Sequence, residues 1–273
     1  MSMWIVILLA IVQGLTEFLP VSSSGHLAIL EALFGTRGGS AGETLMFEIA
    51  VHIGTLGAVL VFYREKVCLL CRAACTSILP GGAGRERYRG ELRYLGLVFL
   101  GTVPAGIVGV LFHDQVAAAF NSPGIAALFL IATGLYLLMT RIRRVRRSLG
   151  WRSAILIGIA QAIAILPGCS RSGWTIATAL LLGIGFAEAA EYSFLLSIPA
   201  ILGALGLELV KEPFAPDAGT LMPLVAGALA AFIVGILALR LLIGILNRGA
   251  LHRFALYLIP AGIAAFVYFR FLD

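Results

Sequence analysis

Two short polar stretches interrupt an otherwise apolar chain. The first, QGLTEFLPVSSSGH at residues 13–26, places a carboxylate, three serine hydroxyls and an imidazole within fourteen positions. The second, LPGCSRSGW at residues 166–174, places an arginine between two serines. Guanidinium and hydroxyl groups bind phosphate oxygens, and a serine beside an imidazole can become an oxygen nucleophile. Together the two stretches predict phosphoryl transfer or phosphate-ester hydrolysis.

The serines stand just before positions where a new helix is expected to begin. The simplest interpretation is that they only cap free backbone N–H groups. Two helix N-termini that face one cavity would also offer N–H donors and partial positive charge to an anion. Arg171 favours phosphate as that anion, because its planar fork fits phosphate oxygens, although pairing with Glu17 is the alternative. The candidate anion-binding residues are Ser22, Ser24, Ser170, Arg171 and Ser172.

Gln13 and Glu17 are four residues apart and therefore lie on one face of a helix, one turn from each other. One carboxylate and one amide oxygen can hold a divalent cation whose other ligands are water and phosphate oxygens. We therefore expect a metal ion, Mg²⁺ or Ca²⁺, at this pair. Glu17 as a general base, as an orienting group for His26, or as an interhelical hydrogen-bonding group are the alternatives.

His26 follows Ser23 by three positions, within reach of its hydroxyl. A lone histidine is usually structural, but this one has serine, carboxylate and arginine side chains for company. The pair predicts Ser23 as nucleophile and His26 as its base. Direct attack by an activated water, with Ser23 only donating a hydrogen bond, is the alternative.

The elements that must position these residues are membrane helices. The chain is 60% hydrophobic and 12% charged, with a mean hydropathy of +1.01, whereas soluble domains are about 25% charged. Several apolar segments approach or exceed the ~20 residues that span a bilayer, about twice the length of a barrel strand. We expect an all-α polytopic membrane protein with six spans: Glu43–Tyr63, Leu95–Phe112, Gly124–Thr140, Glu191–Val210, Thr220–Leu246 and Phe254–Leu272.

The basic residues predict the orientation of these spans. Of 20 Lys and Arg, seven lie in 64–93 and six in 141–152, whereas 113–123 has none. Cytoplasmic loops carry the excess of basic residues, so the first two segments are predicted inside and the third outside. The run RIRRVRR at 141–147 could suggest nucleic-acid binding, but orientation and contact with anionic lipid are commoner roles for such a run. We therefore expect no nucleic-acid partner.

The two broken segments also resemble each other, which predicts an inverted repeat within a single membrane domain, residues 1–273. Repeat one covers about 1–147 and repeat two about 148–273. In each, one re-entrant helical hairpin precedes three spans, and the two hairpins enter from opposite faces and meet near the midplane. This architecture is also that of many transporters, so a lipid-phosphate transporter or flippase is the main rival to an enzyme.

The first stretch resembles the (Glu/Gln)-x-x-x-Glu motif and the following serine–histidine stretch of the undecaprenyl-pyrophosphate phosphatases, the bacitracin-resistance family. PGCSRSGWT at 167–175 fits their Pro-Gly-x-Ser-Arg-Ser-x-x-Thr motif at every specified position. Three further stretches are similar to the family, so that the resemblance covers nearly the whole chain: FEIAVHIGT at 47–55, VPAGIVGVLFHD at 103–114 and EYSFLLSIP at 191–199.

The resemblance implies an enzyme of the bacterial inner (plasma) membrane that removes the terminal phosphate of undecaprenyl pyrophosphate, which recycles the lipid carrier for the cell wall and confers bacitracin resistance. It also implies about ten helices with two re-entrant pairs, a site that faces the periplasm and a divalent metal.

By matching position, the resemblance assigns the roles of the site residues. It makes Ser23 the nucleophile, His26 its base or acid, and Glu17 with Gln13 the metal or catalytic pair. Arg171, Ser170, Ser172 and Thr175 would cradle the pyrophosphate. Many members have Glu at the position of Gln13, and some have Gln at that of His52. The role of His52 and a homodimer are left open.

Overall fold

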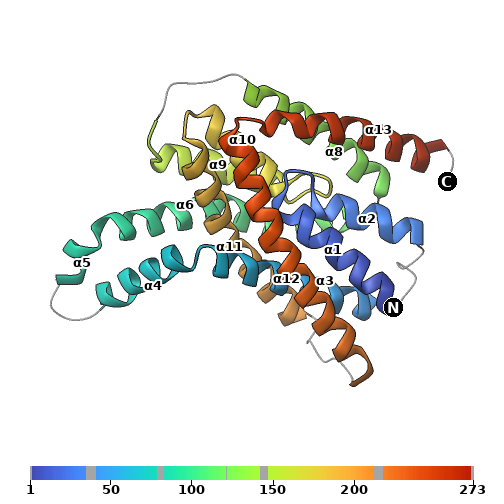
Figure 1. Ribbon diagram of the computed structural model, residues 1–273, viewed down its shortest axis with the longest axis horizontal. Helices are drawn as coiled ribbons and strands as arrows, with labels where there is room; N and C mark the ends of the chain where they lie inside the picture. Colours follow the sequence, from blue (N-terminus) through green and yellow to red (C-terminus); the bar gives the residue numbers. More distant parts are fainter. Residues whose placement is uncertain are drawn as a thin grey trace.

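The computed structural model describes residues 2–34, 41–78, 83–120, 122–141, 147–211 and 218–271. Within these ranges all regular secondary structure is helical (Figure 1). The elements are α1 (Met3–Phe18), α2 (Ser23–Phe34), α3 (Ala41–Phe62), α4 (Arg64–Ile78), α5 (Ala83–Arg87), α6 (Arg89–Leu111), α7 (His113–Phe120), α8 (Pro123–Leu138), η2 (Met139–Arg141), α9 (Trp151–Ile163), α10 (Arg171–Leu181), α11 (Phe186–Lys211), α12 (Ala218–Asn247), η3 (Leu251–Phe254) and α13 (Ala255–Phe271).

Six helical segments of the described chain are long and apolar enough to cross a membrane. They lie in α3, α6, α8, α11, α12 and α13, and each overlaps one of the six predicted spans. This confirms the all-helical, multi-pass membrane fold.

The two helices that lead into the polar stretches, α1 before α2 and α9 before α10, are each too short to cross the bilayer. α1 has 16 residues and α9 has 13, which correspond to about 24 Å and 20 Å against a hydrocarbon core of about 30 Å. Each ends shortly before a proline, Pro20 or Pro167. A proline disfavours the helical conformation in the residue that precedes it, so the helix does not continue up to the proline. We call the segments around these breaks, 19–26 and 164–174, the first and second tips; each includes the first residues of the helix that follows, α2 or α10.

The two tips lie against each other near the centre of the molecule, where the blue and yellow loops come together in Figure 1. Ser172 Oγ donates a hydrogen bond to the carbonyl of Leu19 over 3.3 Å. A Cβ atom on Gly25 would lie only 2.9 Å from the Cα of Gly168. Gly168 itself has φ +89° and packs its backbone against Ala126 of α8, so a side chain has neither the conformation nor the room there.

Helix packing is related between the two halves. α1 packs against α12 and α9 packs against α6, which is the pairing expected if α1 corresponds to α9 and α6 to α12. α8 packs against α13, its own counterpart. This arrangement is consistent with an inverted repeat. The boundary near residue 147, the single-domain assignment and the re-entrant path of the two pairs stay predictions, and residues 142–146 of the second basic segment lie outside the described residues.

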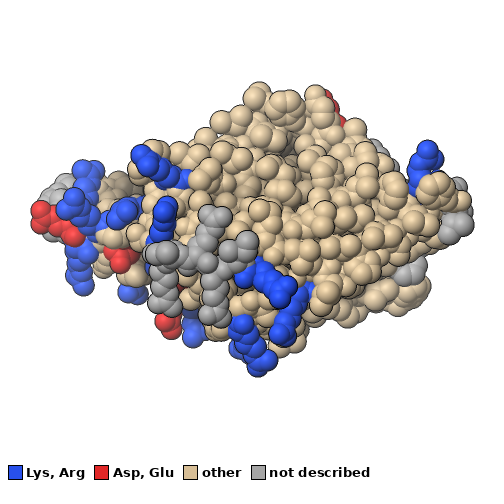
Figure 2. Space-filling model, turned by 90° about the horizontal axis from the view of Figure 1, so that it is seen from above, with Lys and Arg blue, Asp and Glu red and all other residues tan. Residues whose placement is uncertain are grey.

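Basic side chains gather over the end of the molecule that carries α4 and α5 (Figure 2). A second group of basic side chains lies nearer the lower middle of the same view and one more at its right-hand end, and the surface between them is mostly uncharged. The larger of the two buried apolar clusters found among the described residues includes Phe18 next to the first tip, Val21 within it and Ile176 just after the second. The tips are therefore supported by the main core.

Candidate active site

Glu17 stands at the junction of the two tips and receives three hydrogen bonds. Nη2 of Arg171 donates to Oε1 over 2.7 Å. Ser23 Oγ and Gln13 Nε2 donate to Oε2 over 2.7 Å and 3.1 Å. The side chains of Glu17 and Arg171 are only 7% and 15% exposed. One carboxylate thus joins residues that are predicted to belong to opposite halves of the chain.

The serines of the first tip form a cap. Ser22 Oγ accepts the backbone N–H of Gly25 over 3.2 Å and lies 3.3 Å from Ser24 Oγ. The middle residue, Ser23, projects away from this pair and reaches Glu17.

The second tip repeats the same arrangement with arginine in the middle. Ser170 Oγ accepts the backbone N–H of Gly173 over 3.1 Å and lies 3.2 Å from Ser172 Oγ. The middle residue, Arg171, again reaches Glu17. We call 22–24 and 170–172 the two triplets. In each triplet the first serine is a helix cap, as the simplest interpretation held, and the middle residue faces the carboxylate.

Two polar atoms beside Glu17 are buried without a partner in the described part of the chain: Oε1 of Gln13 and Nη1 of Arg171. A buried donor or acceptor without a partner costs roughly 1–3 kcal/mol, so such atoms call for an explanation. One is an acceptor that suits a cation and the other a cationic donor that suits an anion. Arg171 therefore pairs with Glu17, the alternative considered above, and still keeps a nitrogen for phosphate.

The predicted metal pair can be tested against this geometry. Among the described residues no group of three or more His, Cys, Asp or Glu side chains could hold an ion. Gln13 Oε1 and Glu17 Oε2 are two possible oxygen ligands for a metal ion, one helical turn apart. Mg²⁺ commonly takes one or two protein oxygens and completes its shell with water and phosphate. Two protein oxygens are enough for an ion that binds together with its phosphate ligand.

His26 has different partners from the one that the sequence predicted. Its Nδ1 lies 2.7 Å from the carbonyl oxygen of Ser22, and its Nε2 lies 2.6 Å from the hydroxyl of Tyr257 in α13. The expected Ser23–His26 hydrogen bond is replaced by the Ser23–Glu17 bond. Ser22 explains the change, since its backbone is left-handed with φ 69° and its carbonyl also accepts the N–H of His26. Such a conformation costs a non-glycine residue on the order of 1–3 kcal/mol.

Thr175 is buried one turn behind Arg171 and does not join the cluster. Its hydroxyl hydrogen-bonds the carbonyl of Arg171 over 2.8 Å and Ser193 Oγ of α11 over 2.6 Å. Ser172 is tied to the first tip through Leu19. Thr175 therefore supports the arginine from behind, and Ser172 links the two tips.

Two residues outside the quoted polar stretches also belong to the surroundings of the site. Thr133 of α8 accepts hydrogen bonds from the backbone N–H of Ser170 and from Trp174 Nε1, and donates to the carbonyl of Gly168. It thereby holds the second tip on both sides of Arg171. His52, whose role the sequence left open, lies within electrostatic range of Glu17.

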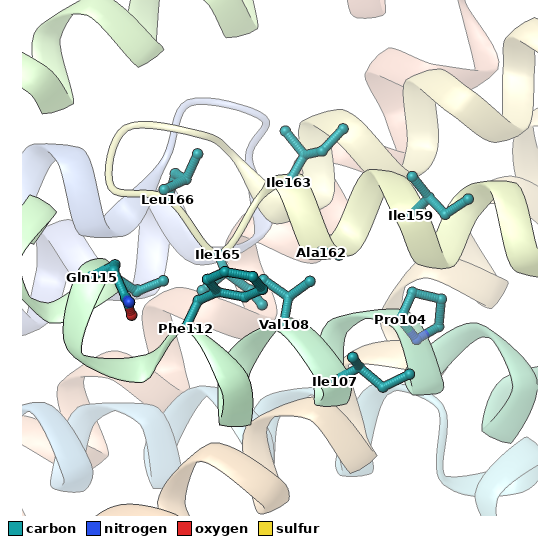
Figure 3. Close-up of a pocket in the computed structure, with 11 residues that line it drawn as sticks. Pro104, Ile107, Val108, Phe112, Gln115, Ile159, Ala162, Ile163, Ile165 and Leu166 are labelled. Carbon is teal, nitrogen blue, oxygen red and sulfur yellow. The ribbon is translucent and has the colours of Figure 1, made fainter.

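An apolar groove of about 620 Å³ lies between α6, α7 and the end of α9 (Figure 3). Leu166 of the second tip forms part of its wall, two residues before the Gly168 that packs against Gly25. The groove therefore shares its wall with the tip that carries Arg171. Its lining is Pro104, Ile107, Val108, Phe112, Gln115, Val116, Ile159, Ala162, Ile163, Ile165 and Leu166.

Comparison with known proteins places this chain. The family described as bacitracin resistance protein BacA matches residues 6–264. An undecaprenyl-diphosphatase of Korarchaeum cryptofilum is 42% identical over 265 residues, which cover 94% of this chain and 96% of the relative. One from Bacteroides fragilis is 40% identical over 274 residues, 96% of each chain, and one from Alkaliphilus metalliredigens is 39% identical over 259 residues, 92% of this chain and 93% of the relative.

The family match begins within α1 and ends within α13, so it contains both tips, five of the six candidate spans in full and part of the sixth. The two tips, whose arginine and serine share one buried carboxylate, lie within the matched residues, and the match together with these relatives shows that the chain belongs to the bacitracin resistance protein BacA family.

Proposed function

We propose that this protein is an integral membrane phosphatase that hydrolyses undecaprenyl pyrophosphate to undecaprenyl phosphate and inorganic phosphate. The observation that carries the proposal is the Glu17 carboxylate, which holds the hydroxyl of Ser23 and the guanidinium of Arg171 at 2.7 Å each. The names of the relatives support the substrate. In a bacterial cell the activity would recycle the lipid carrier for the cell wall and confer resistance to bacitracin.

In the proposed reaction Ser23 Oγ attacks the terminal phosphorus. Its proton passes to Oε2 of Glu17, the acceptor it already contacts. The bond from phosphorus to the bridging oxygen breaks and undecaprenyl phosphate leaves. Water then cleaves the phosphoserine to release phosphate, and Ser23 recovers a proton. Nη1 of Arg171 binds the phosphoryl oxygens throughout, as a fixed positive charge for the transition state. Attack by water in the first step stays the alternative.

Gln13 and Glu17 would hold the proposed Mg²⁺ or Ca²⁺. When bound, the ion would offset the charge of the pyrophosphate, which Arg171 cannot do alone because Glu17 already neutralises it. Ser22, Ser24, Ser170 and Ser172 would line the anion site together with the first N–H groups of α2 and α10.

The orientation of the site follows from the basic residues. Their gathering at the α4 and α5 end supports that end as cytoplasmic. We propose an inner (plasma) membrane location, with the substrate reached from the periplasmic side. A homodimer stays a prediction.

Phosphate release from undecaprenyl pyrophosphate by the purified protein in detergent tests the function. We expect release with Mg²⁺ or Ca²⁺ and none after chelation with EDTA. Detergent removes the two compartments, so a flippase without hydrolytic activity would leave the pyrophosphate intact. Intact pyrophosphate under every metal condition would contradict the phosphatase assignment.

We further propose that the groove beside the second tip holds part of the prenyl chain of this substrate. Its lining is almost entirely apolar, and its wall continues through Leu166 and Gly168 to the triplet that carries Arg171. A lipid whose pyrophosphate lies at Arg171 would have this groove as a neighbouring apolar surface. The prenyl chain would gain about 25 cal/mol of binding free energy for each Å² of its surface that leaves water for the groove. Surface that moves into the groove from the lipid bilayer would gain less.

Filling the groove tests this placement. Ile159→Trp on α9 is expected to raise the KM for undecaprenyl pyrophosphate roughly fivefold to tenfold, about 1–1.4 kcal/mol of lost contact. The KM for a short isoprenyl pyrophosphate should stay unchanged. Leu156→Trp is the matched control, since Leu156 is 46% exposed and Ile159 is 45% exposed on the same helix, but Leu156 does not line the groove. An unchanged KM for the long substrate in Ile159→Trp would refute the placement.

A further inference from the structure

His26 and Tyr257 form a contact that joins the first tip to the last helix of the chain. The hydroxyl of Tyr257 lies 2.6 Å from Nε2 of His26. The two rings are stacked with centroids 5.7 Å apart and planes 15° from parallel. The residues are 231 positions apart in the chain, and nothing in the motifs of either tip involves α13.

The other ring nitrogen determines how this hydrogen bond runs. Nδ1 of His26 faces the carbonyl oxygen of Ser22 at 2.7 Å. A carbonyl only accepts, so Nδ1 carries the hydrogen. In the neutral ring Nε2 is then the lone-pair nitrogen, and it accepts the hydroxyl proton of Tyr257. The imidazole is thus held in one orientation and one tautomer.

This arrangement also determines where His26 can exchange a proton. Nδ1 is committed to Ser22, so a proton enters or leaves at Nε2, where the tyrosine oxygen stands. A hydroxyl both donates and accepts, so it can take one proton while it gives another. Tyr257 is 49% exposed, so the residue that His26 contacts reaches the surface of the helix bundle.

We propose that Tyr257 is the positioning residue of His26 and the outlet of a His26–Tyr257 proton relay, anchored by the Ser22 carbonyl, that serves the phosphatase site. The inference rests on the proposed function. Because Ser23 gives its proton to Glu17, the relay serves the water step. As water attacks the phosphoserine, its proton moves to the tyrosine oxygen and the hydroxyl proton of Tyr257 moves to Nε2. The leaving Ser23 oxygen takes back the proton that Glu17 holds, and the imidazolium then gives its proton through the tyrosine oxygen to bulk water, so that Ser23, Glu17, His26 and Tyr257 all return to their starting forms.

Tyr257→Phe tests the relay, because it removes the hydroxyl and keeps the stacked ring. With undecaprenyl pyrophosphate in detergent we expect kcat to fall roughly tenfold to a hundredfold, up to the lower end of general acid–base effects because His26 itself is kept, with KM within about twofold. In a His26→Ala background the same substitution should cause no further loss. Tyr268→Phe, on the same helix and without a contact to His26 in the described structure, is the control and should leave kcat unchanged.

The relay fails if Tyr257→Phe keeps the kcat of the wild type, or if it lowers kcat by the same factor with and without His26. A wild-type protein that releases no phosphate contradicts the proposed function instead. A second measurement is independent of activity: NMR of ¹⁵N-histidine-labelled protein, with the His26 signal assigned from His26→Ala. We expect an Nδ1–H tautomer whose Nε2 resonance shifts in Tyr257→Phe and not in Tyr268→Phe. An unshifted resonance overturns the Tyr257–His26 bond itself.

Discussion

Arg171→Ala is expected to abolish phosphate release, with a loss of at least roughly a thousandfold in kcat/KM. Removal of one preorganised donor to a developing charge typically costs a factor of about 10²–10³. Arg171 is in addition the cation that compensates Glu17. Release of inorganic phosphate from undecaprenyl pyrophosphate in detergent measures the effect.

The same substitution leaves a buried carboxylate without its partner, which costs about 3–5 kcal/mol. Loss of activity must therefore be separated from unfolding. The double variant Arg171→Ala with Glu17→Gln removes the unpaired charge, and we expect it to recover thermal stability but not activity. Arg171→Lys keeps the charge and loses the fork, so it should retain only a small part of the activity. Full activity in Arg171→Ala would rule out the assigned site.

Glu17→Gln is expected to lower kcat by roughly 10²–10⁴, the usual range for a general acid–base group. The amide has nearly the same shape as the carboxylate and can still accept from Ser23, but it does not take up the serine proton. The substitution also removes the one charged ligand of the proposed metal pair, Gln13 and Glu17. Phosphate release at saturating substrate, over a range of Mg²⁺ concentrations, measures the change.

Glu208→Gln is the control for this variant, because Glu208 on α11 pairs with His113 and not with either tip. It should behave as the wild type. If excess Mg²⁺ restores Glu17→Gln fully, Glu17 acts only as a metal ligand and the proton-acceptor role is wrong.

The sequence was sufficient for the membrane fold, because hydrocarbon thickness and backbone hydrogen bonding leave few choices to an apolar chain of this composition. It also predicted that Glu17, Ser23 and Arg171 would converge, since both tips carried polar residues too costly to bury without one another. These residues belong to contiguous motifs, and the spacing within a motif is visible in one dimension.

Contacts between distant apolar helices were not predictable in this way. Tyr257 lies within ALYLIP and Thr133 within LIATGL, where a single hydroxyl carries no pattern. The partner of His26 was also hidden, because the ring is turned toward Tyr257 by its hydrogen bond to the Ser22 carbonyl. That carbonyl is placed by a left-handed backbone conformation, which is rare for serine. Thr175 was assigned from its motif, but a motif does not say which side of the helix turns toward the substrate.

The two triplets also have a consequence for how such a site could arise. In each, the first serine accepts a backbone N–H and lies within hydrogen-bond distance of the third serine, so the middle position can change while the shape of the tip is kept. A chain that began as two equal copies would need a new residue at only one such position to acquire different chemistry on its two sides. Scaffold and reactivity are thus inherited separately, and an almost symmetric protein carries out a reaction that has a direction.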